Sequence, residues 1–376
     1  MIYLDYNATT PVAPEVAEAM LPYLKDYFGN PSSSHWYGQQ TKQAVEKARE
    51  QVASLLNCET DEIVFTSGGS ESNNFALKGY ALAHQGRGKH IITSAIEHPA
   101  IIEVCRYLEI SDFEITYLPV DETGRVQVED VEKAIRPDTI LITIMYANNE
   151  VGTLQPISEI SALAKQHNII VHSDCAQAVG KVPVDVQELD VDLLTVAGHK
   201  FYGPKGIGAL YIRKGIQLQK LIHGADHERN QRAGTENILE ISGLGKAAEI
   251  AKKGMDQRIR KEIEMRNRLR KGLSQLNDVR FNGNTDHCLP NTLSASFKNL
   301  RASDILAEMK NIAASAGAAC HTDSISVSST LAAMKVPMEY AMGTIRLSIG
   351  RYTTDEEIDA AIKEISAAVK KLRGTE

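Results

Sequence analysis

The sequence predicts an α/β fold, in which a large domain built on a mostly parallel β-sheet covered by helices is joined to a smaller α/β domain. Three observations predict it. From residue 39 to residue 212, short β-rich apolar runs alternate with segments that have helical spacing of apolar residues. After about residue 250 the pattern changes to a long charged helix, shorter strands and a final helix. The length of 376 residues also exceeds what one hydrophobic core usually holds, which favours two domains.

The first elements establish the alternation. Residues 39–56 carry apolar side chains at three- and four-residue steps, among them Ala44, Ala48 and Val52, as in an amphipathic helix. A β-rich run at 62–66 follows. Further strands are expected at 90–94, 114–118, 140–146, 169–173, 192–196 and 209–212, and further helices at 70–84, from 99 and at 157–167. Strands separated by helices are typical of a parallel sheet with both faces covered.

The carboxyl-terminal part forms a second unit. A helix rich in Arg, Lys and Glu is expected at 256–277, strands at 291–297 and 344–349, and a last helix from about Thr354. We therefore expect a large domain at 13–255, and a small domain made of 1–12 and 256–376 that carries the segment around Cys320.

Composition excludes several classes of protein. The net charge of -7, with interspersed signs, gives no basic stripe for a nucleic acid. No run of about 18 apolar residues and no secretory leader pattern is visible, so we expect a cytoplasmic protein without a membrane span. The five cysteines are scattered without CxxC spacing, so neither disulfides nor a metal site are expected; they are Cys58, Cys105, Cys175, Cys288 and Cys320.

The segment 197–208 places Lys200 after a predicted strand and before a glycine-rich turn. A lysine amine whose charge is suppressed can form a Schiff base with a carbonyl cofactor. Asp174 ends the preceding apolar strand, where it can keep the pyridine nitrogen of pyridoxal phosphate (PLP) protonated, and Gln177 can bond the phenolic oxygen. The alternatives are a surface lysine in a turn and an aspartate that caps a helix.

Two further segments suit the same cofactor. In 65–74, two glycines connect a predicted strand directly to the start of a predicted helix. The free backbone N–H groups at a helix start form an anion site, to which Ser70 can add a side-chain donor. His98 follows the strand 90–94, where an imidazole can stack on the pyridine ring and move protons. Either segment can also be an ordinary turn or cap.

Cys320 and Arg346 are candidates for the substrate side. Cys320 lies among small and polar residues at 313–329, which favours an accessible thiol, and His321 can assist its ionisation. A partly buried thiol is the alternative. Arg346, on an alternating strand, can clamp a carboxylate with two hydrogen bonds.

Taken together, these residues closely resemble the cysteine desulfurase and selenocysteine lyase family, within the fold type I PLP-dependent transferases related to class V aminotransferases. The resemblance runs almost end to end, through LDYNATTP, GNPSS, TSGGSES, NNEVG, HKFYGP, RAGTEN and IRLSIGR. It implies the α/β architecture with large and small domains described above. It also implies PLP as cofactor.

The resemblance assigns roles residue by residue. It implies Lys200 as the Schiff-base lysine, His98 over the ring, Asp174 on the pyridine nitrogen, Gln177 on the phenolic oxygen, Gly69, Ser70 and His199 on the phosphate, and Asn149 on the cofactor. It further implies Thr235 on the phosphate of the partner subunit, hence a homodimer, Asn30 and Arg346 on the substrate carboxylate, and Cys320 as the residue that accepts sulfur or selenium.

The implied activity is conversion of L-cysteine to L-alanine, with sulfur passing to Cys320 and on to an acceptor such as an iron–sulfur scaffold protein. Ala197 stands where many desulfurases have Ser, and His227 where Gln is usual. Together with the segment 317–323, which looks more like selenocysteine lyases, these departures leave selenocysteine lyase as an alternative. A nicotinamide-dependent oxidoreductase lacks its GxGxxG pattern here, and the intact Lys200 and Asp174 argue against a non-catalytic scaffold.

Overall fold

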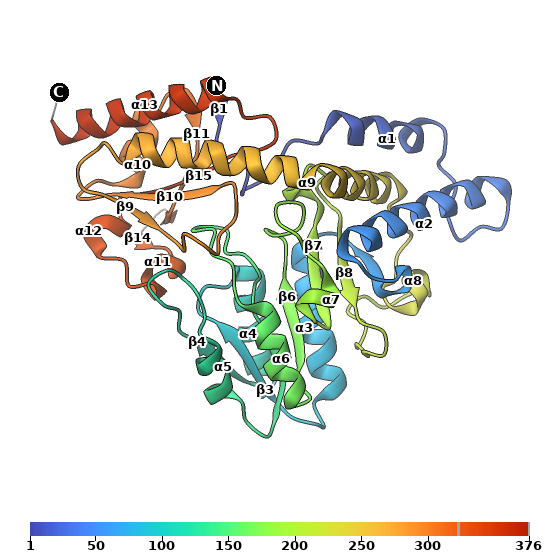
Figure 1. Cartoon of the computed structure of the whole chain (residues 1–376). Coiled ribbons are helices and arrows are strands. Elements are labelled where there is room, and N and C mark those ends of the chain that lie inside the picture. Colours follow the sequence, from blue (N-terminus) through green and yellow to red (C-terminus); the bar gives the residue numbers. More distant parts are fainter. Residues whose placement is uncertain (322–323, 375–376) are drawn as a thin grey trace.

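The computed structural model describes residues 1–321 and 324–374, with the side chains of 318–321 and 324–326 outside the description (Figure 1). Its centre is a seven-stranded sheet of order β2-β8-β7-β6-β5-β3-β4. The strands are β2 (Ile63–Thr66), β3 (His90–Ser94), β4 (Glu114–Leu118), β5 (Thr139–Thr143), β6 (Ile170–Asp174), β7 (Leu193–Ala197) and β8 (Gly208–Ile212). β8 runs antiparallel to both neighbours, and the other pairs are parallel. The predicted α/β fold is confirmed.

Consecutive side chains of the central strands enter two different hydrophobic cores. Leu193 belongs to the core on one face and Leu194 to the core on the other, and Leu141 and Ile142 divide in the same way. Successive residues of a strand point to opposite faces, so both faces of this sheet are buried. The covering helices are α2 (Trp36–Leu56), α3 (Gly69–His84), α4 (Pro99–Ile110), α5 (Val128–Ala134), α6 (Ile157–Gln166) and α7 (Val186–Leu189).

A second, smaller sheet lies beside the first (Figure 1), with order β12-β15-β10-β9 and antiparallel pairing. Its strands are β9 (Val279–Asn282), β10 (Thr292–Phe297), β12 (Ser315–Ala316) and β15 (Thr344–Ser348), and α10 (Ala302–Glu308) and α13 (Asp355–Arg373) pack with it. The chain's first strand, β1 (Ile2–Tyr3), pairs with β11 (Ile312–Ala313), and Leu4 enters the core of this small domain. The remaining short elements here are β13 (Ala318–His321), β14 (Ser324–Val327), α11 (Ser329–Ala333) and α12 (Met338–Ala341).

One long helix, α9 (Ile238–Leu273), joins the two domains. Leu244 and Ala248 near its start pack in the large core, whereas Leu269 and Leu273 pack in the small one. The helix predicted at 256–277 therefore begins 18 residues earlier than expected. The expected boundary between 255 and 256 falls inside this continuous helix, so the domain limits remain a prediction.

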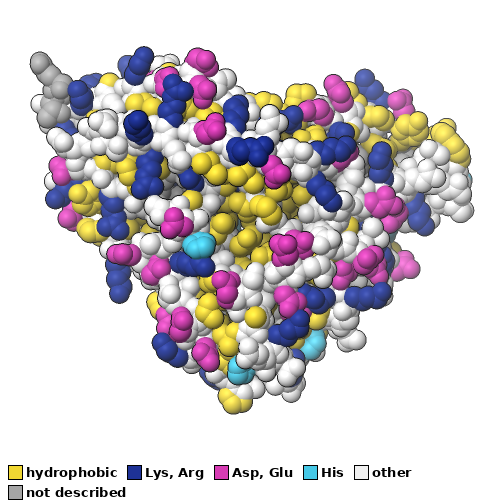
Figure 2. Space-filling view, in the orientation of Figure 1, with side chains coloured by type: hydrophobic (Ala, Val, Ile, Leu, Met, Phe, Trp, Pro, Cys, Tyr) yellow, Lys and Arg dark blue, Asp and Glu magenta, His cyan; other side chains and the backbone are white. Residues whose placement is uncertain are grey.

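Large apolar side chains are exposed where α1 (Pro14–Lys25) leads into α2; they are Leu21, Leu24, Phe28, Trp36 and Tyr37. Figure 2 shows hydrophobic side chains at this end of the molecule and near the middle of the face between the two lobes. Contiguous exposed apolar surface on a folded chain usually marks an interaction site. Among the helices of residues 1–321 and 324–374, each is too short or too polar to cross a lipid bilayer.

Candidate active site

A cavity of about 350 Å³ opens at the carboxyl edge of the large sheet. Strands β2, β3, β5, β6 and β7 all end at this edge, where open α/β sheets bind their ligands. The polar side chains that line it are Asn7, Ser70, Asn73, His98, Asn149, Asp174, Gln177, His199, Lys200 and Arg346, and Gly69 and Ala197 line it as well. The structure thus brings together most of the residues that the sequence singled out.

Lys200 reaches the cavity from the 3-10 turn η2 (Gly198–Lys200), which follows β7 directly. Its Nζ donates hydrogen bonds to the backbone carbonyls of Asn7 (2.9 Å) and Ala8 (2.8 Å). Burial lowers the pKa of Lys200 to about 8, and the positive charge of Arg346 adds to this effect. A substantial share of the amine is therefore neutral near physiological pH, as a nucleophile toward a carbonyl must be.

Asp174 is the last residue of β6, and only 7% of it is exposed. The Nδ2 of Asn73 donates to its Oδ2 (2.7 Å), and the backbone N–H of Ala176 donates to its Oδ1 (2.9 Å). A carboxylate has about four acceptor positions, so these two bonds orient the group and leave capacity toward the cavity. The Oδ1 of Asn73, also at this cavity, is a buried acceptor without a partner among the described residues.

The start of α3 forms an anion site at one end of the cavity. Its N-cap, Gly68, has a φ of +147°, a conformation essentially reserved for glycine. The first backbone N–H groups of a helix have no partner within it, and the first two residues of this helix, Gly69 and Ser70, line the cavity. A β-carbon built on Gly69 would lie 3.4 Å from the Cβ of Ala197, so the position that lacks a serine hydroxyl adjoins this site.

His199 lies at the same end, with its Nδ1 3.1 Å from the Oγ1 of Thr9. Burial, together with the nearby cations Lys200 and Lys205, lowers the pKa of His199 to about 4. The imidazole is therefore neutral in the ligand-free protein. One ring nitrogen contacts Thr9, and the other is left for a ligand.

His98 caps α4, accepting at its Nδ1 from the backbone N–H of Ala100 (3.1 Å). The ring faces the open cavity, and the protein around it lowers the pKa of His98, an effect that Asp174 opposes and Lys200 reinforces. The preceding residue, Glu97, is buried and accepts hydrogen bonds from Ser94 Oγ (2.6 Å) and from the backbone N–H of Met145. Burial raises the pKa of Glu97 to about 8.

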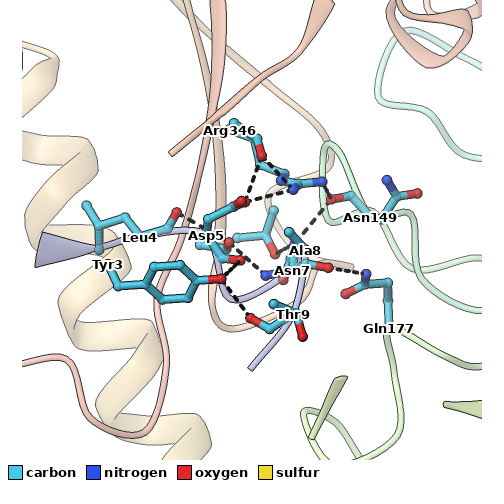
Figure 3. A network of polar contacts seen from close by, with 12 residues as sticks. Tyr3, Leu4, Asp5, Asn7, Ala8, Thr9, Asn149, Gln177 and Arg346 are labelled. Atoms are coloured by element: carbon cyan, nitrogen blue, oxygen red, sulfur yellow. Dashed lines mark hydrogen bonds and ion pairs between the residues drawn. The ribbon is translucent and has the colours of Figure 1, made fainter. Parts of the chain in front are cut away.

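Arg346 enters the cavity from β15 of the small domain (Figure 3). Its Nη2 donates to Asp5 Oδ1 (2.8 Å) and Ser315 Oγ (3.1 Å), and its Nη1 donates to the carbonyl of Asn149 (3.1 Å). Its Nε is buried without a partner among the described residues. Three of five N–H groups therefore hold the guanidinium in place, which leaves donors for a carboxylate.

Asn7 connects several parts of the site, and Figure 3 shows some of its contacts. Its carbonyl accepts from Lys200 Nζ and from Gln177 Nε2 (2.8 Å). Its side-chain Nδ2 donates to Thr292 Oγ1 (2.8 Å) and to the carbonyl of Asn149 (3.1 Å). The residue is fully buried, so the amino-terminal segment is an integral part of the site rather than a surface tail.

Two of the predicted residues lie away from this cavity, and for a third the structure describes only the backbone. Asn30 lies exposed between α1 and α2, and Thr235 lies exposed before α9; neither lines the cavity. Cys320 is on β13, opposite Ile325 in β14, and its side chain lies outside the described residues. The roles expected for these three remain predictions.

Four residues of the site were not predicted from sequence: Asp5, Asn7, Asn73 and Lys181. Asp5 and Asn7 belong to the amino-terminal motif, which carried no assigned role, and Asn73 follows Gly69 by four positions on α3. Lys181 follows Gln177 by four positions in an otherwise apolar stretch. Its position among apolar residues is the only feature of the sequence that could have identified Lys181 as a buried lysine.

The donors and acceptors of the cavity fit PLP. Its volume lies within the usual range of small-molecule sites. An amine with a pKa near 8, a buried carboxylate with free acceptor positions and a helix start lie at separate places around one space. They match the aldehyde, the pyridine nitrogen and the phosphate of this cofactor. Within the described residues no cluster of His, Cys, Asp and Glu suits a metal ion.

Comparisons with known proteins extend over the whole chain. The family described as "Aminotransferase class-V" matches residues 2–361. The chain is 50% identical over 375 residues to "Cysteine desulfurase IscS" of Dictyoglomus turgidum, which covers 99% of this chain and 95% of that protein. It is 48% identical over 374 residues to the protein of the same name from Methanosarcina thermophila, covering 99% and 93%. A solved structure titled "NIFS-LIKE PROTEIN" has a TM-score of 0.93 at 39% identity, covering 98% of this chain and 99% of that one.

Proposed function

The chain belongs to the class V aminotransferase family, within its cysteine desulfurases, and we propose that the cavity at the carboxyl edge of the large sheet is the active site of this PLP-dependent enzyme. The activity converts L-cysteine to L-alanine and transfers the sulfur to an acceptor. The observation that carries the assignment is the placement of Lys200, with its lowered pKa, in one cavity with Asp174 and His98.

The residues around the cavity would hold the cofactor at three points. Gly69, Ser70 and His199 would hold its phosphate, Asp174 its pyridine nitrogen, and Gln177 its phenolic oxygen. When bound through Lys200, PLP supplies an electron sink that stabilises negative charge at the substrate's α-carbon. Asn149 would contact the cofactor from the turn after β5.

The chain's own groups bind the substrate and move its protons. Arg346 would receive the substrate carboxylate with the N–H groups that Asp5, Ser315 and Asn149 leave free. The Nζ of Lys200, once released by the incoming amino group, would take the α-proton, because its lowered pKa suits a general base near neutral pH. His98 would stand over the ring as a second group able to exchange protons.

Cys320 would accept the sulfur. Its thiolate attacks the sulfur of bound L-cysteine, a sulfur–sulfur bond forms, and the bond between that sulfur and the β-carbon breaks with its electron pair going to the carbon side. With protons added at the α- and β-carbons, L-alanine leaves and Cys320 carries a persulfide, so that one cysteine and one thiol become one alanine and one persulfide.

We also infer that the enzyme works as a homodimer in the cytoplasm. The exposed apolar side chains around α1 and the start of α2 support an interface, since a lone chain seldom leaves such a surface open. Thr235 lies on an exposed loop outside its own cavity, which suits a contact with the phosphate in the other subunit. An acceptor such as an iron–sulfur scaffold protein would receive the persulfide sulfur.

Trapping with borohydride tests the assignment of Lys200. The protein is saturated with PLP, its visible absorption is recorded, and it is reduced, digested and mapped by mass spectrometry. A pyridoxyl group on the Lys200 peptide is expected. Lys200→Gln should lose both the band and the adduct, whereas Lys165→Gln, which changes an exposed lysine, should keep both. An adduct on another lysine, or none, would refute the assignment.

Replacement of cysteines tests the second step. Cys320→Ala should keep the visible band but form no persulfide and little alanine, whereas Cys58→Ala, at a partly buried thiol whose pKa burial raises to about 12, should behave as wild type. Unchanged sulfide release by Cys320→Ala would exclude its role. The same assay run with L-selenocysteine distinguishes the lyase alternative, which predicts alanine mainly from that substrate.

A further inference from the structure

A second buried lysine, Lys181, stands directly behind the cavity and has no part in the mechanism described above. Only 6% of Lys181 is exposed. Its Nζ donates to the side-chain Oε1 of Gln177 (2.5 Å) and to the Oδ1 of Asn7 (2.9 Å). Both of these residues line the cavity, so Lys181 touches the proposed cofactor site through them.

The contact with Lys181 determines which way the amide of Gln177 points. In its ammonium form Lys181 can only donate hydrogen bonds, which places the amide oxygen toward Lys181 and the NH₂ group toward the other side. There, Nε2 donates one hydrogen to the carbonyl of Asn7 (2.8 Å). Its second hydrogen remains for a ligand in the cavity.

Without the lysine, only the hydrogen bond from Nε2 to the carbonyl of Asn7 would, among the described residues, orient this amide. A reversed amide would turn an oxygen toward the phenolic oxygen of PLP, and two acceptors would then face each other. Lys181 also carries positive charge, and only the side chain of Gln177 would separate that charge from the phenolic oxygen. The other charged groups around it are Lys200 after β7, Arg346 on β15 and Glu262 on α9.

The charge of Lys181 is finely balanced by these surroundings. Burial lowers the pKa of Lys181 to about 7, Lys200 and Arg346 lower it as well, and Glu262 opposes them. A phosphate and an ionised phenolic oxygen in the cavity would favour the ammonium form, because nearby negative charge raises the pKa of an amine.

We propose that Lys181 is a positioning residue, which turns the NH₂ group of Gln177 toward the phenolic oxygen of PLP and stabilises negative charge on that oxygen. The inference rests on the proposed roles of Lys200 and Gln177. Stabilising this charge weakens the hold of the phenolic oxygen on the proton that it shares with the nitrogen of Lys200. Lys181 therefore sets the pH at which the bound cofactor loses that proton.

Titration of the visible absorption of the holoenzyme tests this inference, without reference to turnover. Lys181→Met should raise the midpoint by at least about one pH unit, a tenfold change in the dissociation constant of the proton. Lys181→Gln keeps a hydrogen-bond donor but removes the charge, so its midpoint should lie between the midpoints of the wild type and of Lys181→Met. Lys165→Met removes an exposed positive charge and should titrate as wild type.

A double variant shows whether Lys181 acts through Gln177. In a Gln177→Leu background, which has no amide to orient, Lys181→Met should shift the midpoint much less than it does alone. An equal shift in both backgrounds would overturn the orienting role, and a wild-type midpoint in Lys181→Met would overturn the inference entirely.

The outcomes separate this inference from the proposed function. If wild-type protein shows no visible band and no adduct on Lys200, the proposed function fails. If both are present and the Lys181 variants titrate as wild type, only the inference fails. Should Lys181→Met not fold, the midpoint of Lys181→Gln decides, because a value equal to wild type would still exclude the charge.

Discussion

The acidity of Lys200 in the ligand-free protein is a property that the structure predicts quantitatively. With a pKa of about 8, about a tenth of the amine is neutral at pH 7. An ordinary lysine with a pKa of about 10.5 has roughly 0.03% in that form. At pH 7 the neutral fraction of Lys200 should therefore be about 300 times that of an ordinary lysine, which favours reaction with an amine-specific reagent.

Two substitutions should move this pKa in opposite directions. Arg346→Met removes a cation that lowers the pKa of Lys200 and leaves Asp5 unpaired, and both effects raise it. Asp174→Asn removes an anion that raises the pKa, so the midpoint should fall. Opposite shifts indicate electrostatic control, whereas a general loosening of the site would move both variants toward the ordinary lysine value.

Competitive labelling with acetic anhydride between pH 6 and 11 measures this pKa directly in apoprotein. Peptide mass spectrometry gives the acetylated fraction of Lys200, with exposed Lys205 in the same digest as a reference for reagent decay. The expected midpoint is near pH 8. A midpoint at or above pH 10, or shifts of the same sign in the two variants, would refute the reasoning.

Three further predictions concern the cofactor site and its support. Ala197→Ser should lower the dissociation constant of PLP about tenfold in fluorescence titrations, because one hydroxyl would be added beside the anion site at Gly69. Gly68→Ala should cost about 1–3 kcal/mol in urea unfolding and weaken PLP binding, because its φ of +147° strains an L-residue. Glu97→Gln should remove a pH dependence of stability. Folded Glu97 holds its proton up to about pH 8, whereas the unfolded chain releases it near pH 4.5, so the wild type loses stability as pH rises through that window and the variant should lose less.

The elements that carry Asp174 and Lys200 could be predicted from the sequence because buried parallel strands are short, continuous apolar runs. The residue at which α9 begins could not be predicted in this way. Gly243 and Gly245 weaken the helical pattern there, yet a β-carbon at Gly245 would lie 2.5 Å from Ala48, so glycine permits the close packing of α9 on α2. Tertiary packing thus overrides local propensity at these positions.

Within the site, the residues near the strand ends of the large sheet could be placed together from the sequence, whereas Asp5, Asn7 and Lys181 could not. Asp174 ends a strand of the large sheet, and Gly69, His98 and Lys200 each follow one, so these residues are neighbours because they share one edge of the sheet. The motif around Asn30, by contrast, lies exposed between α1 and α2, and its sequence alone does not indicate what it contacts.

The amino-terminal segment explains how one chain aligns groups from two domains. The carbonyl of Asn7 holds Lys200 and Gln177 of the large domain, while its side chain holds Thr292 of the small domain. The neighbouring Asp5 holds Arg346. Because Asn7 is fully buried and each contact uses a different atom or lone pair, the domains cannot shift at this point without breaking several hydrogen bonds at once. The guanidinium of Arg346 and the amine of Lys200 are therefore held in place relative to each other before any ligand arrives, which is the preorganisation that the proposed proton transfer at the α-carbon would require.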